Sequence, residues 1–496
     1  MRSWSGRARP SEIRGNQNQI IQVKTMHIRL RSIPFVVALA TLLVATPRAV
    51  DAQRMVTDDP VLQLIWDQAM NNSQFETLGT ALLDENELAI IDARDHESYS
   101  RGHLLWAANM RAADANSTAP MLVPRRSTRV VVMDNGGDEA DHLQRILTAE
   151  GWTNVSVLDG GIKSWSDAGY ELYSGVSVPS KLFGELVERH YGTPHVSATE
   201  LRQWMEQERP LTILDSRTER EFQRMSIPTA RSCPGGELVH RAFDLVDADA
   251  TIVVNCAGRT RSILGTESLI RSGIPSRVVA LENGTMGWEL ADLTLDHGES
   301  NAAPTPTPSG RKQASLAARQ VAERFNVKRV NSATVNQWRT DDARTLYLFD
   351  VRTPHEYQKG HPRGFRTAPG GQLVQNTDEY AITRGARIVL ADDDLTRSTM
   401  TASWLLEMGW ETYVLDEGVN EGPLEVGIPE LPPDIPPVVV PPNSGDADSI
   451  LGTESLVRAG MPATRQAMQD YLHWEVGLVD QYDRDDLARF TSSGWA

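Results

Sequence analysis

The 496-residue chain is poor in basic residues relative to acidic ones, and this shortage excludes one class of partner. It holds 49 Lys and Arg against 66 Asp and Glu, which gives a formal net charge of −17. Proteins that bind nucleic acids neutralise phosphates with basic surfaces, so we expect no binding to DNA or RNA. An acidic charge balance does not by itself specify any other partner.

The apolar segment near the start of the chain is too short to cross a bilayer. Residues 33–45 form an apolar run of about 13 residues, whereas a membrane-spanning helix needs about 20. Basic residues 26–31 precede the run, and the Val-Asp-Ala sequence at 50–52 has the small-residue spacing of a signal-peptidase site. We therefore predict a signal peptide at residues 26–52, and an uncleaved membrane anchor is the alternative.

A cleaved signal has consequences for where the protein works. Residues 1–25 would be an extension ahead of the true start, because Met26 begins a signal of ordinary length. The mature chain would begin near Gln53 and would have no stable membrane insertion. We expect it to be exported to the periplasm, which is an oxidising compartment.

Cysteine is scarce, since the chain has only Cys233 and Cys256. Cys256 follows an apolar strand pattern and opens a tight loop with two arginines, before a helix that Ser262 can cap. Loop N–H groups, a helix N-terminus and guanidinium groups all favour negative charge. We therefore predict that Cys256 is more acidic than a free cysteine and is reactive, rather than an inert core thiol.

One local pattern, an apolar strand followed by Asp-x-Arg, is written three times. The copies lie at residues 88–94, 211–217 and 346–352. After each copy comes a Glu or Ser with an aromatic: Ser98 and Tyr99, Glu221 and Phe222, Glu356 and Tyr357. About 41 or 42 residues after each Asp, a second strand ends in a loop that leads into a helical pattern and a third strand. Alternating strands and helices predict parallel α/β units, so we expect three domains of roughly 100 residues.

The repeated residues resemble the rhodanese (sulfurtransferase) family. The family pattern is Asp-x-Arg, Glu-x-x-aromatic, Gly-His as in Gly102-His103 and Gly360-His361, a Pro-Gly turn, and then strand, cysteine loop and helix. The second repeat departs from it, with Met225-Ser226 in place of Gly-His. The resemblance covers about residues 65–425 and is closest to bacterial proteins with several tandem rhodanese domains. It implies small parallel sheets with helices on both faces and an active loop at the carboxyl end of the central strand.

The predicted organisation combines this resemblance with composition. The predicted segments are a signal peptide at 26–52, an inactive rhodanese-like domain 1 at 65–175, an active domain 2 with Cys256 at 190–297, a linker at 298–318, an inactive domain 3 at 319–426, a Pro-rich linker at 427–448 and a helical tail at 449–496. Pro-rich segments are stiff and extended. We therefore expect the linkers to space the domains without joining them.

The tail after the last linker carries two further signals. Residues 449–460 nearly copy residues 262–273, the helix behind the cysteine loop, so we interpret them as a partial duplication without its strand and cysteine. Further on, apolar side chains recur at helical spacing, which predicts an amphipathic helix packed on a neighbouring domain. These side chains are Met468, Leu472, Val476, Val479 and Tyr482.

The resemblance places Cys256 in the nucleophile position and implies double-displacement catalysis. The thiolate would attack the outer sulfur of thiosulfate or a similar small anionic donor, and the persulfide would pass its sulfur to cyanide or to a thiol such as thioredoxin or glutathione. The loop residues expected to hold the anions are Ala257, Gly258, Arg259, Thr260, Arg261 and Ser262. Arg259 and Arg261 are expected to attract the donor and keep the thiol ionised. No cofactor or metal is expected at this site.

The length of the cysteine loop indicates which substrate it suits, and the other two loops indicate which domains are active. Related phosphatases and arsenate reductases have Cys-x5-Arg, whereas Arg261 lies one residue short, so the loop favours a sulfane sulfur over phosphate. Domains 1 and 3 have Asp134 and Asp392 at the cysteine position, and a carboxylate cannot carry a persulfide. Both domains should be catalytically silent. A cation site at Asp392, Asp393 and Asp394 is the alternative for domain 3.

Two questions stay open from the sequence alone. Cys233 is interpreted as a small apolar residue that fills a turn, or as a second thiol that bonds reversibly with Cys256 in an oxidising compartment. The whole chain is interpreted as a sulfurtransferase, and the alternative is a non-catalytic scaffold that binds a partner or a small anion.

Overall fold

The computed structural model describes residues 78–84, 86–245, 249–419, 424–427 and 464–490. The predicted signal peptide, residues 428–448 of the predicted Pro-rich linker and the copied segment at 449–460 lie outside these residues. Within the described part of the chain, no helix combines the length and the apolar character needed to cross a membrane.

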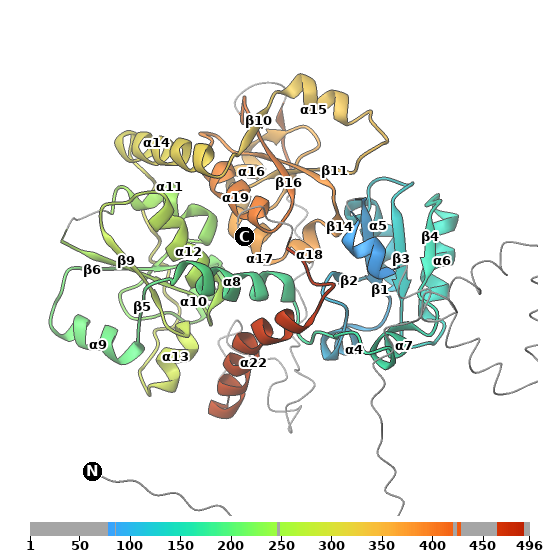
Figure 1. Cartoon of the computed structure of the whole chain (residues 1–496). Helices are drawn as coiled ribbons and strands as arrows, with labels where there is room; N and C mark the ends of the chain where they lie inside the picture. The colour runs from blue at the N-terminus through green and yellow to red at the C-terminus, as the bar shows by residue number, and fades with distance from the viewer. Residues whose placement is uncertain (1–77, 85, 246–248, 420–423, 428–463, 491–496) are drawn as a thin grey trace, which may run out of the picture. The chain divides into compact units, whose positions relative to one another are not determined.

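The chain forms three five-stranded sheets, one for each repeat, and Figure 1 shows the repeats in chain order from blue through green to orange. The first repeat supplies four strands of its sheet, and the fifth is β14 (Thr383–Arg384) from the third repeat. The first contains β1 (Leu88–Asp92), β2 (Ala107–Asn109), β3 (Arg129–Met133) and β4 (Val155–Val157). The second has the order β5 (His195–Val196), β9 (Arg277–Leu281), β8 (Thr251–Asn255), β6 (Leu211–Asp215), β7 (Arg231–Ser232). The third has the matching order β10 (Lys328–Val330), β16 (Glu411–Leu415), β15 (Arg387–Ala391), β11 (Leu346–Asp350), β13 (Arg366–Thr367).

Helices cover both faces of these sheets. The helices of the repeats are α4 (His96–Arg101), α5 (Ala115–Leu122), α6 (Glu139–Ala149), α7 (Gly161–Asp167), α9 (Ala198–Glu206), α10 (Glu219–Arg224), α11 (Leu238–Ala242), α12 (Thr260–Arg271), α13 (Gly284–Leu290), α15 (Ser332–Trp338), α16 (Pro354–Lys359), α17 (Gly370–Gln375), α18 (Thr377–Tyr380) and α19 (Thr396–Glu407). The strand pairs within the second and third sheets are parallel. The predicted α/β fold with small parallel sheets is therefore confirmed.

The central strand of the second sheet shows why these sheets must be covered on both faces. In β8, Ile252, Val253 and Val254 are all completely buried, which an alternating surface strand would not allow. Such continuous β-branched runs form the middle strands of parallel sheets. The register pairs Asp215 of β6 with Asn255 of β8, so both strands end at the same edge. Cys256 follows at that edge.

The Asp-x-Arg motif is a buried structural clamp. Arg217 donates to both carboxylate oxygens of Asp215, with Nη2 2.7 Å from Oδ2, and the same nitrogen donates to the carbonyl of Met225 at 2.6 Å. Arg94 and Arg352 make the same contacts with their own aspartates and with the carbonyls of Gly102 and Gly360. Because the clamp needs only a backbone carbonyl, the second repeat keeps it although Met225 replaces glycine.

The repeats are joined to one another, which differs from the expectation of spaced domains. Strand β14 (Thr383–Arg384) of the third repeat pairs antiparallel with β1 of the first. Helix α14 (Pro308–Arg324) begins inside the predicted linker at 298–318 and packs against α11 and α19, as Figure 1 shows. The reason is local, because Thr307 caps a helix that has proline in its first turn, where proline is favoured.

Two further helices tie the repeats together. Helix α8 (Val178–Tyr191) follows the first repeat, and α22 (Arg465–Arg484) is the predicted tail helix; the two pack against each other. Met468 and Leu472 are buried as predicted, but Val476 is 49 % exposed and Glu475 takes its place on the buried face. Steps of four residues advance about 400° around a helix, so a stripe with that spacing drifts off one face.

The contact between the second and third repeats contains a buried ion pair. Arg271 at the end of α12 donates to Glu407 of α19 at 2.8 Å, and its guanidinium lies 3.4 Å from the ring centroid of Trp404. The side chains of Arg271 and Glu407 are both about nine-tenths buried or more. Removing either side chain would leave the charge of the other buried and without a partner.

We predict that Arg271→Ala lowers the free energy of unfolding by about 3 kcal/mol, since it strands the Glu407 carboxylate and removes a cation–π contact. Arg202→Ala is the matched control, because Arg202 forms an exposed pair with Glu206 within α9 and such pairs contribute less than about 1 kcal/mol. Urea unfolding of both variants measures the difference. Equal losses of unfolding free energy in the two variants would contradict a stabilising role for the buried ion pair between the repeats.

Candidate active site

Cys256 lies where β8 ends and is held in a closed loop. It is 2 % exposed, and its Sγ lies 3.3 Å from Oγ of Ser262 in the first turn of α12. The N–H groups of Thr285 and Met286 donate to the carbonyls of Cys256 and Ala257 at 2.9 and 3.0 Å. Gly284 makes this approach possible, because its φ is +55° and a Cβ there would lie 2.3 Å from the Cys256 carbonyl oxygen.

The two loop arginines, predicted to act together, have different partners. Arg261 donates from Nη1 and Nη2 to the two oxygens of Glu221, both at 2.9 Å, and the pair is buried. Arg259 instead donates to Glu185 at 2.7 and 2.8 Å and also pairs with Glu188, both on α8. Arg261 lowers the pKa of the Cys256 thiol by its charge, whereas Arg259 anchors the loop to α8.

The acidity of Cys256 differs from the sequence-based prediction. Burial raises the pKa of the Cys256 thiol; the charge of Arg261 and the Ser262 hydrogen bonds lower it, and the charge of Glu475 raises it again. The net direction is upward. The sequence shows the arginines that lie close to Cys256 along the chain. It does not show that two helices from distant parts of the chain bury the thiol.

Helices α8 and α22 supply this cover. A Cβ at Gly184 of α8 would lie 2.8 Å from Cγ2 of Thr260, so α8 sits directly on the loop. From α22, Tyr471 and Leu472 approach Gly258, and Glu475 Oε1 accepts a 2.6 Å hydrogen bond from Thr260 Oγ1. The predicted loop residues thus face two helices of the same chain rather than solvent.

Three carboxylates beside the loop were missed as site residues. The sequence could have indicated Glu221 as a site residue, because Glu221 and Glu356 stand at the same position in two repeats. Glu185 lies 74 positions and Glu475 215 positions from their loop partners, and nothing local marks either residue.

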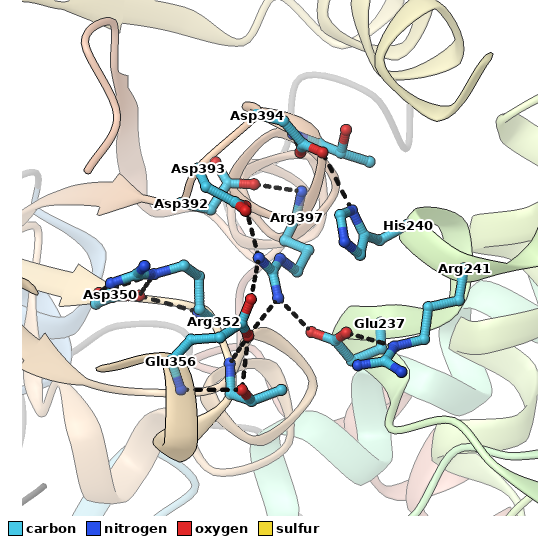
Figure 2. Close-up of polar contacts among 12 residues, drawn as sticks. Glu237, His240, Arg241, Asp350, Arg352, Glu356, Asp392, Asp393, Asp394 and Arg397 are labelled. Carbon is cyan, nitrogen blue, oxygen red and sulfur yellow. Dashed lines mark hydrogen bonds and ion pairs between the residues drawn. The ribbon is translucent and has the colours of Figure 1, made fainter. Parts of the chain in front are cut away.

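The loop of the third repeat keeps the machinery of the second around an aspartate. Ser398 Oγ donates to Asp392 at 2.6 Å, as Ser262 lies against Cys256. Arg397 donates to Glu356, as Arg261 does to Glu221 (Figure 2). Burial raises the pKa of Asp392 to about 6, against the lowering effect of Arg397.

The three aspartates of this loop bring oxygens within 4.8 Å of one another, as a cation site would require. Two of the three also contact basic side chains of the protein. Arg397 donates to Asp393 at 2.6 Å, and His240 of the second repeat lies 3.3 Å from Asp394 (Figure 2). Arg397 also donates to Glu237 of the second repeat at 2.8 Å. The cluster therefore joins two repeats, and the cation site stays a prediction from the sequence.

The first repeat closes its loop in another way. Asp134 accepts hydrogen bonds from the backbone N–H groups of Gly136, Gly137 and Ala140, at 2.6, 3.1 and 3.0 Å. Glu139 stands five residues after Asp134, where the other repeats have arginine. A carboxylate that caps its own loop has no free position for an anionic donor.

Cys233 packs as a core residue. It is completely buried in a cluster with Leu214 and Leu238, and burial raises the pKa of its thiol. Both cysteines are free thiols in this structure. This packing agrees with the interpretation of Cys233 as a small residue that fills a turn.

Comparison with known proteins identifies the family. Residues 78–168, 197–291 and 333–422 each match the model of the rhodanese-like domain. The chain belongs to the rhodanese-like family. The structure of a thiosulfate sulfurtransferase from Pseudomonas aeruginosa is 35 % identical, with a TM-score of 0.74, and the match covers 84 % of this chain and 99 % of that one. The uncharacterized protein YibN of Escherichia coli K12 is 24 % identical over 98 residues, 19 % of this chain and 68 % of YibN.

The pKa of the Cys256 thiol can be tested by titration. In a Cys233→Ala background, the ultraviolet absorbance of the Cys256 thiolate reports its titration. We predict a midpoint above about 8.5, the value of a free cysteine, because burial outweighs Arg261. Cys256→Ala in the same background removes the signal and is the control. A midpoint below that of a free cysteine would restore the prediction made from the loop sequence.

Proposed function

We propose that this rhodanese-like protein is a sulfurtransferase that moves sulfane sulfur from thiosulfate or a similar anionic donor through a Cys256 persulfide. The observation that carries the proposal is the loop of the second repeat. It alone among the three loops ends its strand with a thiol, and it has the Arg261 and Glu221 pair and Ser262 beside that thiol. The likeness to a thiosulfate sulfurtransferase at 35 % identity supports the same class of reaction.

The first half-reaction is a displacement at sulfur. The Cys256 thiolate forms a bond to the outer sulfur of thiosulfate, the bond between the two donor sulfurs breaks, and sulfite leaves with the electron pair. Ser262 Oγ donates to the Arg259 carbonyl at 2.8 Å and lies within reach of Sγ. Rotation of this hydroxyl would let it donate to the thiolate instead. Arg261, fixed by Glu221, would offset the negative charge.

The second half-reaction returns the enzyme to its starting state. Cyanide or a thiolate attacks the outer sulfur of the persulfide, and Cys256 leaves as the thiolate. Thioredoxin or glutathione would suit as thiol acceptors in a cell. Export to the periplasm belongs to the same proposal and depends on the predicted leader at residues 26–52.

The other two loops support a single working site. Asp134 is engaged by backbone N–H groups, and Asp392 by Ser398 and the Arg397 backbone. A carboxylate has no sulfur to carry a persulfide. The first and third repeats therefore act as structural parts of the sulfurtransferase.

The decisive experiment incubates the mature chain with thiosulfate and cyanide and measures thiocyanate. We predict that Cys256→Ala reduces thiocyanate to the uncatalysed background, because the covalent carrier is lost. Cys233→Ala is the matched control and should retain activity, since Cys233 packs in the core. Mass spectrometry after thiosulfate alone should find one added sulfur atom on the peptide with Cys256. Equal thiocyanate from wild type and Cys256→Ala would leave the non-catalytic scaffold as the function.

A further inference from the structure

Glu475 is a buried acid at the candidate active site that the proposed reaction does not use. It lies on the inner face of α22 and is 1 % exposed. Oε1 accepts the hydrogen bond from Thr260, in the loop that carries Cys256. Oε2 has no hydrogen-bond donor among the described residues and would lie 3.2 Å from a Cβ at Gly258. The Glu475 carboxyl group thus lies against both Gly258 and Thr260 of the loop.

The charges that act most on Glu475 come from α8 and from the cysteine loop. Helix α8 contributes Lys181 and Glu185, and the loop contributes Arg259 and Cys256. Arg259 is shared with Glu188, also on α8. On α22 itself the neighbour is Tyr471, whose ring lies 5.5 Å from Lys181 Nζ. The carboxylates of Glu185, Glu188 and Glu475 exceed the two cations by one charge, so a neutral Glu475 would balance the set.

Burial, followed by the like charge of Glu185, raises the pKa of Glu475 to about 7, against the lowering effects of Lys181, Thr260 and Arg259. The carboxyl therefore changes charge near neutral pH. Its negative form in turn opposes ionisation of Cys256. As pH rises, Glu475 ionises first and delays the appearance of the thiolate.

We propose that Glu475 is a positioning residue of this site, which holds the Thr260 side chain by a hydrogen bond, lies against Gly258, and controls by its charge how readily Cys256 loses its proton. The proposal rests on the proposed function for its purpose, because a restrained thiol would be protected until a donor arrives. Its geometry does not depend on that function. The tail helix then belongs to the active site rather than only to the packing of the repeats.

The test compares Glu475→Gln with wild type, both in the Cys233→Ala background. The amide keeps the oxygen that accepts from Thr260 and removes the charge. We expect the midpoint of Cys256 thiolate formation to fall by about one pH unit, the lower end of the effect of a nearby charge. Glu407→Gln is the control for loss of a negative charge far from the thiol, because Glu407 of α19 pairs with Arg271 at the C-terminal end of α12. An unchanged midpoint in Glu475→Gln, or an equal fall in Glu407→Gln, overturns the proposal.

A second variant and a second readout separate charge from fold. Glu475→Met is also uncharged and of similar length, so it should lower the midpoint as well, and either folded variant decides the test. The pKa of Glu475 rises from about 4.3 in an unfolded chain to about 7 on folding. The stability that this group contributes is full below pH 4.3 and is lost as pH rises through 7. The wild-type melting temperature should therefore fall more steeply than that of Glu475→Gln across this window, and parallel curves would contradict the assigned titration.

These readouts need no sulfur donor, so their failure is distinct from failure of the proposed function. In the thiocyanate assay, Glu475→Gln should shift the alkaline rise of the rate to lower pH by the same amount as the thiolate midpoint. A shifted thiolate midpoint in a chain that makes no thiocyanate would retain the role of Glu475 and reject the sulfur transfer.

Discussion

The buried carboxylate of Asp215 is the interaction on which the active edge of the second sheet depends. It receives the guanidinium of Arg217 at the end of β6 and, from the neighbouring strand, the Asn255 amide at 2.9 Å. Asn255 is the residue before Cys256, so one carboxylate ties the clamp of one strand to the end of the next. A buried charge with every oxygen engaged is costly to disturb, and the position of the thiol is fixed for that reason.

The same edge exists three times, which allows the chemistry to differ while the frame stays constant. Where the strand ends in Cys256, serine and an arginine with its glutamate surround a thiol. Where it ends in Asp392, the equivalent serine donates to a carboxylate, and the arginine donates both to its own Glu356 and to Glu237 of the second repeat. The charged residues of the third loop thus form part of the interface with the second repeat, and Arg397 links the two.

The local pattern of the sequence was sufficient to predict the three α/β units, the parallel sheets, the place of Cys256 at the end of the central strand and the tail helix. Each depends on residues within a few turns or on one repeat compared with another. The direction of the Cys256 pKa and the partners of Arg259 were missed because both depend on packing between segments. Glu185 and Glu475 approach the loop from α8 and α22, and no spacing rule connects them with it. The spaced domains were wrong for the same reason, since strand β14 completes a sheet that begins almost 300 residues earlier.

The raised pKa of Cys256 is compatible with a thiol that reacts only when its burial is relieved or when the charge of Glu475 changes. Two helices exclude water from the loop, and desolvation penalises the thiolate and the Glu475 carboxylate alike. Because the two groups repel each other when both are ionised, protonation of Glu475 favours ionisation of the Cys256 thiol. A buried acid next to a buried nucleophile therefore couples two titrations that would be independent in water. In the proposed persulfide intermediate, whose outer sulfur is anionic, the same coupling would favour the protonated acid and stabilise the intermediate.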